Sequence, residues 1–166
     1  MVAVLPCGKV LVAGGYGGRS GGYVTAAELW DPATGSWSDL PPMAEGRFHA
    51  GCCVLPSGRV VVTGGLDSNH GSRRDGAAFD PVAQTWQFLP PMVHNRWRHG
   101  VVAVPGGLVA VGGAREDDEG NAVPDELFDE SSGRWFELPH PMAEPRAVCR
   151  AALLPASALA APAAAQ

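Results

Sequence analysis

Short apolar runs that end in paired glycines recur along the chain. Two of them, KVLVAGG at 9–15 and RVVVTGG at 59–65, are rich in β-branched residues, as β-strands are. Each follows another apolar run and a Cys-Gly or Ser-Gly pair, which predicts a hairpin turn between two strands. Before the alanine-rich tail, no segment shows the 3.6-residue apolar period of a helix. The pattern therefore predicts an all-β protein.

The pattern is also periodic. The same phrase occurs three times, as WSDLPPM at 37–43, WQFLPPM at 86–92 and WFELPHPM at 135–142. The tryptophans that open these phrases are 49 residues apart, and so are the turn-forming residues Asp31, Asp80 and Asp129. Landmarks that share one period indicate an internal structural repeat of about 50 residues.

Each repeat contains the signals of four antiparallel strands. After the first hairpin and the paired glycines come an apolar strand such as AELW, a turn such as DPATG, and a last strand that begins at the tryptophan. We expect the units to occupy residues 1–43, 44–92 and 93–142. A single strand at 146–155 would begin a fourth unit, before a low-complexity Ala/Pro tail at 156–166.

The paired glycines, the later aspartate after an aromatic residue and the spaced tryptophan together resemble the kelch motif. This resemblance covers residues 1–155 and implies a β-propeller of three four-stranded antiparallel blades. The glycine pairs are expected to permit positive φ or close packing, and the tryptophans to wedge between neighbouring blades. These structural positions are Gly14, Gly15, Trp37, Gly64, Gly65, Trp86, Gly112, Gly113 and Trp135.

The predicted propeller is incomplete. Met1 aligns with Gly51, so a counterpart of residues 47–50 is missing before it, whereas 146–155 matches 47–56. Three blades do not comfortably close a ring, because propellers usually have about 4 to 8 blades. Three alternatives stay open: a fragment of a larger propeller, which the shortened first strand favours, half of a ring that two copies share, or a stable open arc.

Composition and charge exclude several classes of partner. The formal net charge is −5, so nucleic acid is not an expected partner. The N-terminal residues do not resemble a signal peptide, and no run reaches the ~18 apolar residues of a membrane helix. We therefore expect a cytoplasmic protein without a membrane partner.

The four cysteines do not form a recognisable metal-binding or redox motif. They lie at positions 7, 52, 53 and 149, without a CxxC pair or a Cys/His comb. We expect small buried thiols in a reducing compartment, with Cys52 and Cys53 pointing to opposite faces of one strand. No metal or other cofactor is expected.

The basic residues gather at one end of the predicted blades. The turns after the first and third strands are tight, whereas the connections at 16–25, 66–75 and 114–124 are long. Long irregular loops on a rigid scaffold are common binding sites. Nine of the 12 Lys and Arg fall on this side or at the start of a first strand: Arg19, Arg47, Arg73, Arg74, Arg96, Arg98, Arg115, Arg146 and Arg150.

A partner-binding surface is expected where the chain enters the innermost strands. In kelch ligand-binding domains, arginines at such positions often line a central pocket. The resemblance implies this role for Arg47, Arg96 and Arg98, and less strongly for Arg146. The alternative is that these arginines bridge blades through carbonyl groups or acidic loop residues. The full set of candidate partner-binding residues is Arg47, His49, Arg73, Arg74, Arg96, Arg98, His99 and Arg146.

The resemblance implies a protein–protein interaction module, of the kind that recognises substrates for ubiquitin ligases or acts as a scaffold. Arginine-rich loops suit another protein or an acidic peptide as the partner. A second copy of the chain that completes the ring is an alternative partner. The alternative is a galactose-oxidase-like or mutarotase-like kelch enzyme. A copper-radical site needs tyrosine and histidine at the axis, but Tyr16 and Tyr23 share one loop. We therefore expect neither an enzyme nor any catalytic residue.

Overall fold

The computed structural model describes residues 1–18, 22–115, 123–140, 142–144, 146–148 and 151. The described residues form three four-stranded antiparallel sheets, each ordered as the strands follow in the chain. The first blade contains β1 (Val2–Val4), β2 (Val10–Ala13), β3 (Ala27–Asp31) and β4 (Ser36–Leu40). The second contains β5 (Gly51–Val54), β6 (Val60–Thr63), β7 (Gly76–Asp80) and β8 (Thr85–Leu89). The third contains β9 (Gly100–Val104), β10 (Gly107–Val111), β11 (Glu126–Asp129) and β12 (Arg134–Glu137).

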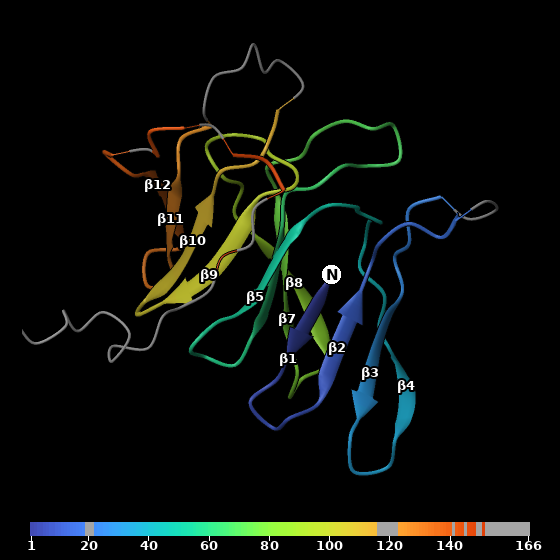
Figure 1. Cartoon of the computed structure of the whole chain (residues 1–166). Helices are drawn as coiled ribbons and strands as arrows, with labels where there is room; N and C mark the ends of the chain where they lie inside the picture. The colour runs from blue at the N-terminus through green and yellow to red at the C-terminus, as the bar shows by residue number, and fades with distance from the viewer. Residues whose placement is uncertain (19–21, 116–122, 141, 145, 149–150, 152–166) are drawn as a thin grey trace, which may run out of the picture.

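The predicted architecture is confirmed, including its incompleteness, since the three sheets do not close into a ring. The first strands β1, β5 and β9 are innermost, and β5 contacts both of the others (Figure 1). The tight turns lie at the lower end of the view and the long connections at the upper end (Figure 1). The long connections and the starts of the innermost strands are thereby gathered at one end of the array.

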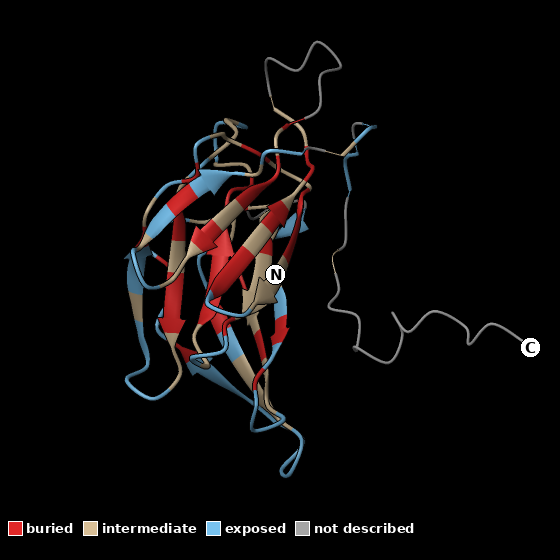
Figure 2. Ribbon diagram, turned by 90° about the vertical axis from the view of Figure 1, so that its left-hand side faces the viewer, coloured by how far each residue is buried: buried red, intermediate tan, exposed pale blue. Residues whose placement is uncertain are grey.

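Two apolar layers hold the blades side by side, one between each pair of neighbouring sheets. Alternation along β6 supplies both of them: Val60 and Val62 pack against the first blade, and Val61 packs against the third. Figure 2 shows that the buried positions are concentrated on strands inside the stack, whereas the hairpin turns are exposed. Cys52 and Cys53 divide between the same two layers, as predicted.

The glycine pairs have the positive φ that was predicted for them. Gly64 has φ 63° and Gly65 has φ 91°, in the left-handed region that side chains disfavour. Space is limited as well, because a Cβ on Gly64 would lie 2.5 Å from the carbonyl oxygen of Arg96. Glycine at this position allows the link between the second and third blades to approach the end of β6.

Two of the three repeated tryptophans join neighbouring blades. Trp86 Nε1 donates a hydrogen bond to the carbonyl of Pro41 at 2.8 Å, and Trp135 Nε1 donates to the carbonyl of Pro90 at 2.8 Å. The prediction was wrong for Trp37, which is 53% exposed. The reason is positional: Trp37 lies on the outer face of the first blade, and no further blade covers this face in the described part of the chain.

The predicted fourth strand is not formed by the residues that can be examined. Arg146, Ala147, Val148 and Ala151 are not in a strand, and the remainder of 146–155 lies outside the described residues. The Ala/Pro tail at 156–166 also lies outside them. The described residues contain no helix long and apolar enough to span a bilayer.

Candidate functional site

Arg47 connects the first two blades through both its backbone and its side chain. Its carbonyl accepts a hydrogen bond from the Gly15 amide of the first blade at 3.0 Å. Its Nη1 donates to the carbonyls of Gly64 and Asp75 in the second blade, each at 3.1 Å. The Asp75 carboxylate accepts a further hydrogen bond from Nη2 at 3.2 Å. The side chain therefore acts as a staple between blades.

Arg96 makes the equivalent contacts between the second and third blades. Its carbonyl accepts from the Gly65 amide at 2.9 Å, and its Nη1 donates to the Gly112 carbonyl at 2.9 Å. Nη2 lies 2.5 Å from Oε1 of Glu126, which also accepts a hydrogen bond from the His94 amide. Burial lowers the pKa of the Arg96 guanidinium, and the adjacent Glu126 carboxylate opposes this shift.

These contacts correct the prediction that Arg47 and Arg96 bind a partner directly. Their exposed fractions are only 4% and 0%, and their guanidinium groups are directed into the neighbouring blade. The alternative interpretation, bridging between blades, describes both residues. By these contacts the two arginines fix the position of the residues that follow them in the links.

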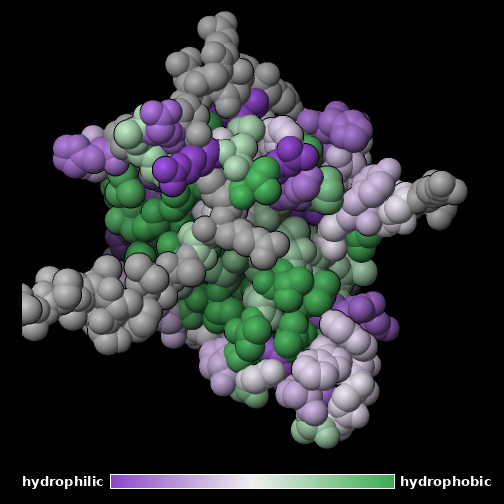
Figure 3. Space-filling model, in the orientation of Figure 1, coloured by the Kyte–Doolittle hydropathy of each residue, from purple (hydrophilic) through white to green (hydrophobic). Residues whose placement is uncertain are grey.

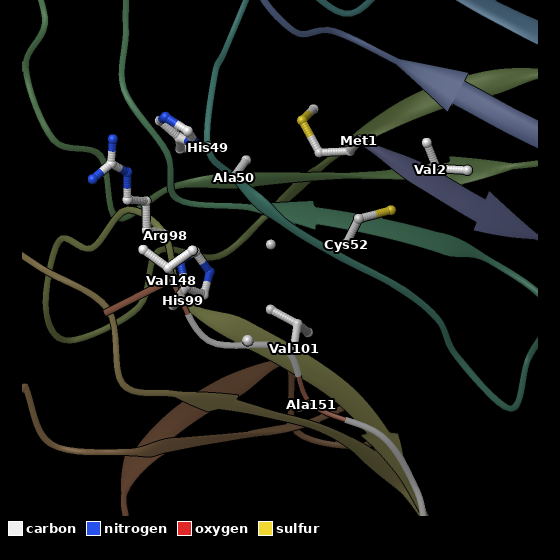
Figure 4. A pocket seen from close by; sticks show the side chains of 12 residues that line it. Met1, Val2, His49, Ala50, Cys52, Arg98, His99, Val101, Val148 and Ala151 are labelled. Carbon is white, nitrogen blue, oxygen red and sulfur yellow. The ribbon is translucent and has the colours of Figure 1, made fainter. Parts of the chain in front are cut away.

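A pocket of about 560 Å3 lies where the innermost strands begin, and we call it the axial pocket. Figure 4 shows His49 and Arg98 together at one end, with Cys52 and Val101 on the strands that form its wall. The lining residues are Met1, Val2, His49, Ala50, Gly51, Cys52, Arg98, His99, Gly100, Val101, Val148 and Ala151. Its polar end and apolar wall suit a ligand with both charged and apolar groups.

His49 and Arg98 occupy equivalent positions in successive links. Both have φ 55°, a left-handed conformation that is uncommon for residues with a side chain. The Arg98 guanidinium stacks over the Trp97 ring, 4.5 Å from its centroid. Burial, with a smaller contribution from Arg98, lowers the pKa of His49, so that its imidazole is neutral at pH 7. Arg98 thus supplies the positive charge of this pair.

His99 belongs to the wall of the axial pocket. It is buried, and neither ring nitrogen has a hydrogen-bond partner among the described residues. Burial, followed by the charge of Arg96, lowers the pKa of His99 to about 3. A Cβ on Gly51 would lie 2.6 Å from its Nε2, so glycine is needed there to accommodate the ring. His99 can therefore offer a neutral hydrogen-bonding nitrogen but not a positive charge.

The cysteines near the axial pocket are held as thiols. Burial raises the pKa of Cys52 to about 11 and that of Cys53 to about 12. Nucleophilic attack and metal binding both require the thiolate, so neither reaction is favoured at these positions. Among the described residues, no group of three or more His, Cys, Asp or Glu side chains is arranged to hold a metal ion.

The remaining candidate residues lie outside the axial pocket. Arg73 is paired with Asp75 at 2.7 Å and with Glu45, and it lines a second pocket of about 450 Å3. Arg74 and Arg146 are exposed. The structure thus brings together only His49, Arg98 and His99 from the predicted set.

Sequence reasoning missed an aromatic cluster next to the axial pocket. Phe48 lies 3.6 Å from His49 and 5.8 Å from Tyr16 between ring centroids, and Trp97 lies 5.9 Å from His49. Tyr23 contacts both Tyr16 and Phe48. The 49-residue period could have revealed this cluster from the sequence, because it aligns Phe48 with Trp97 and His49 with Arg98.

Comparisons with known proteins agree with this geometry. A family model described as the Kelch motif matches residues 1–44 and 46–93. A solved structure titled "Structure of YjhT" aligns with 88% of this chain at 18% sequence identity and a TM-score of 0.73. The chain spans only 52% of the length of that protein. No curated protein sequence matches the chain. The family model covers more than half of the sequence, and the chain belongs to the kelch-motif family.

Proposed function

We propose that the chain is a protein-interaction module that binds an acidic segment of another protein at the axial pocket. Kelch repeats generally mediate protein–protein interactions, which supports the general function. The observation that carries the specific proposal is the position of Arg98, which lines the pocket and stacks on Trp97. In the described part of the chain, none of the ion pairs involves Arg98.

Stacking on Trp97 makes Arg98 a suitable carboxylate receptor. A guanidinium presents parallel N–H groups that match the two oxygens of a carboxylate. Because the ring already restricts the guanidinium, less conformational entropy is lost when a carboxylate binds. The neighbouring Phe48 and the wall residue Val101 favour an apolar side chain beside the acidic group.

We assign this module to substrate recognition in a ubiquitin-ligase or scaffold complex of the cytoplasm. This role is assigned by analogy with kelch proteins that act as substrate receptors of ubiquitin ligases. Free thiols at Cys7, Cys52 and Cys53 support a reducing compartment.

The module has no catalytic activity in this proposal. Support comes from the raised pKa values of Cys52 and Cys53, which disfavour thiolate nucleophiles. The lowered pKa of about 3 at His99 also makes this residue a poor proton acceptor near pH 7.

Binding of a fluorescein-labelled peptide rich in Glu and Leu, followed by anisotropy, tests the proposal. Arg98→Ala should weaken binding about tenfold, or ~1.4 kcal/mol. Arg134→Ala is the matched control, because Arg134 lies on β12 near the tight turn and should leave affinity unchanged. Equal affinities for the two variants would contradict the assignment, and so would binding that does not weaken with added salt.

A further inference from the structure

Aromatic side chains form a continuous row from the axial pocket to the second pocket. Trp97 and Phe48 flank His49, with 5.9 Å and 3.6 Å between ring centroids. Phe48 in turn lies 6.2 Å from Tyr23 and 5.8 Å from Tyr16. His49 lines the axial pocket, whereas Tyr23 lines the second pocket. We call these five rings the aromatic row.

The aromatic row is accessible to solvent and keeps two free hydrogen-bond donors. Tyr16 is 57% exposed, and the other four residues are partly exposed. Within the described part of the chain, neither the Trp97 indole N–H nor the Tyr16 hydroxyl has a hydrogen-bond partner. Figure 3 shows hydrophobic and strongly hydrophilic residues side by side at the end with the long connections. Apolar contacts and hydrogen bonds are therefore both available to a segment that binds here.

The protein already binds proline-containing segments of its own chain with tryptophan side chains. Trp86 Nε1 donates to the carbonyl of Pro41 and Trp135 Nε1 to the carbonyl of Pro90, each at 2.8 Å. Both prolines lie in Leu-Pro-Pro segments that follow the last strand of a blade. Proline lacks an amide N–H but keeps its carbonyl as an acceptor. Trp97 offers the same kind of donor to a segment from outside the array.

We propose that the aromatic row receives a proline-rich stretch of the partner in the polyproline II conformation, beside the acidic residue that Arg98 binds. The inference rests on the proposed function, since it describes a further part of the same partner. A polyproline II backbone makes no internal hydrogen bonds, so one of its carbonyls can accept from the Trp97 indole. It advances about 3.1 Å per residue, so rings 5.8 to 6.2 Å apart match alternate residues. Because this conformation exists before binding, little entropy is lost when it docks on aromatic rings.

Charge determines the direction in which the segment lies. Arg98 stacks on Trp97 at one end of the row and supplies a positive charge there. At the other end, Tyr23 lines the second pocket, whose Arg73 is already paired with Glu45. The acidic residue of the partner should therefore bind at the Arg98 end, and the prolines should extend toward Tyr23.

Fluorescence anisotropy with three labelled peptides tests the proposal. Each peptide has two glutamates at one end, and the residues that follow are rich in proline, in alanine or in phenylalanine. The proline peptide should bind at least about tenfold more tightly than the alanine peptide. Similar affinities of these two peptides would overturn the proposal. Equal or tighter binding of the phenylalanine peptide would also overturn it, because the row would then accept aromatic side chains in general.

Two variants test the contacts assigned to the aromatic row. Trp97→Phe keeps a ring under Arg98 but removes the indole N–H, and Tyr16→Ala removes an exposed ring. Each should reduce the advantage of the proline peptide over the alanine peptide at least about threefold. Phe88→Ala is the control, because Phe88 lies on β8 and is 72% exposed. An advantage that survives undiminished in either Trp97→Phe or Tyr16→Ala would overturn the proposal.

Arg98→Ala distinguishes failure of this inference from failure of the proposed function. It should weaken the binding of all three peptides by a similar factor, because each carries the same glutamates. Weakening without any preference for proline would overturn this inference and retain the acidic partner. A preference for proline without weakening would overturn the acidic contact and the direction assigned to the segment.

Discussion

Arg96 and Glu126 form an ion pair with 2.5 Å between Nη2 and Oε1, and both side chains have no exposure to solvent. The pair joins the link before the third blade to β11 of that blade. The carbonyls of Gly112 and Pro124 accept further hydrogen bonds from Arg96, and the amides of Val93 and His94 donate to Glu126. The buried Nε of Arg96 has no hydrogen-bond partner among the described residues. This arrangement makes the pair a structural element of the interface between blades.

Removal of one member of this pair should strongly destabilise the fold. Arg96→Ala leaves the Glu126 carboxylate buried without its partner, which costs roughly 3–5 kcal/mol. Urea unfolding measures the loss. Arg59→Ala is the control, because its pair with Glu130 is partly exposed and contributes about 0–1 kcal/mol. Similar losses for the two variants would contradict the structural role of Arg96.

The tryptophans between blades should contribute more than exposed aromatic residues. Trp135→Ala removes a buried ring and its hydrogen bond to Pro90, and should lower the unfolding free energy by about 3–5 kcal/mol. Phe88→Ala, at a position 72% exposed, should change it by less than about 0.5 kcal/mol. Thermal or urea unfolding distinguishes these outcomes, and a loss below about 1 kcal/mol for Trp135→Ala would contradict the packing described.

Gly64 should be required for both its φ and its close approach to the next link. In Gly64→Ala the alanine must adopt φ 63°, and its Cβ would lie 2.5 Å from the carbonyl oxygen of Arg96. The end of β6 must therefore shift. Gly58→Ala has φ 86° but no atom within 4 Å, and isolates the conformational effect of about 1–2 kcal/mol. Urea midpoints should fall further for Gly64→Ala, and equal shifts would show that the contact is unimportant.

Acidification should destabilise the protein through His99. Burial holds the folded pKa of His99 at about 3, below the ordinary histidine pKa of 6.5, so the unfolded state binds the proton more readily. Stability contributed by neutral His99 is complete above about pH 6.5 and falls as pH decreases, by up to about 1.4 kcal/mol per pH unit. Unfolding at pH 7 and pH 5.5 should show a steeper loss for wild type than for His99→Gln. Parallel pH dependences would contradict this account of His99.

The sequence predicted what local patterns determine. Paired glycines end β2, β6 and β10, and strand alternation assigns Cys52 and Cys53 to opposite faces, because strand geometry depends on neighbouring residues. The 49-residue period then predicted that the same four-stranded unit occurs three times along the chain. These elements needed no information about distant contacts.

The candidate site depended on contacts that the sequence does not display. Arg47 and Arg98 both lie in links with a similar composition, yet one is buried against Asp75 and the other stacks on Trp97. Asp75 is 28 residues from Arg47, so only the folded array brings them together. A search that followed the period would have separated the buried Arg47 and Arg96 from the pocket residues His49 and Arg98.

The claim that the axial pocket is the binding site is tested most directly by amide chemical-shift perturbation with the Glu/Leu-rich peptide. The account predicts that the largest changes occur at the amides of His49, Arg98 and Gly100 and at the Trp97 indole. Residues of the tight turns, such as Gly58 and Gly133, should not change. Perturbations concentrated at those turns, with the pocket residues unaffected, would contradict it.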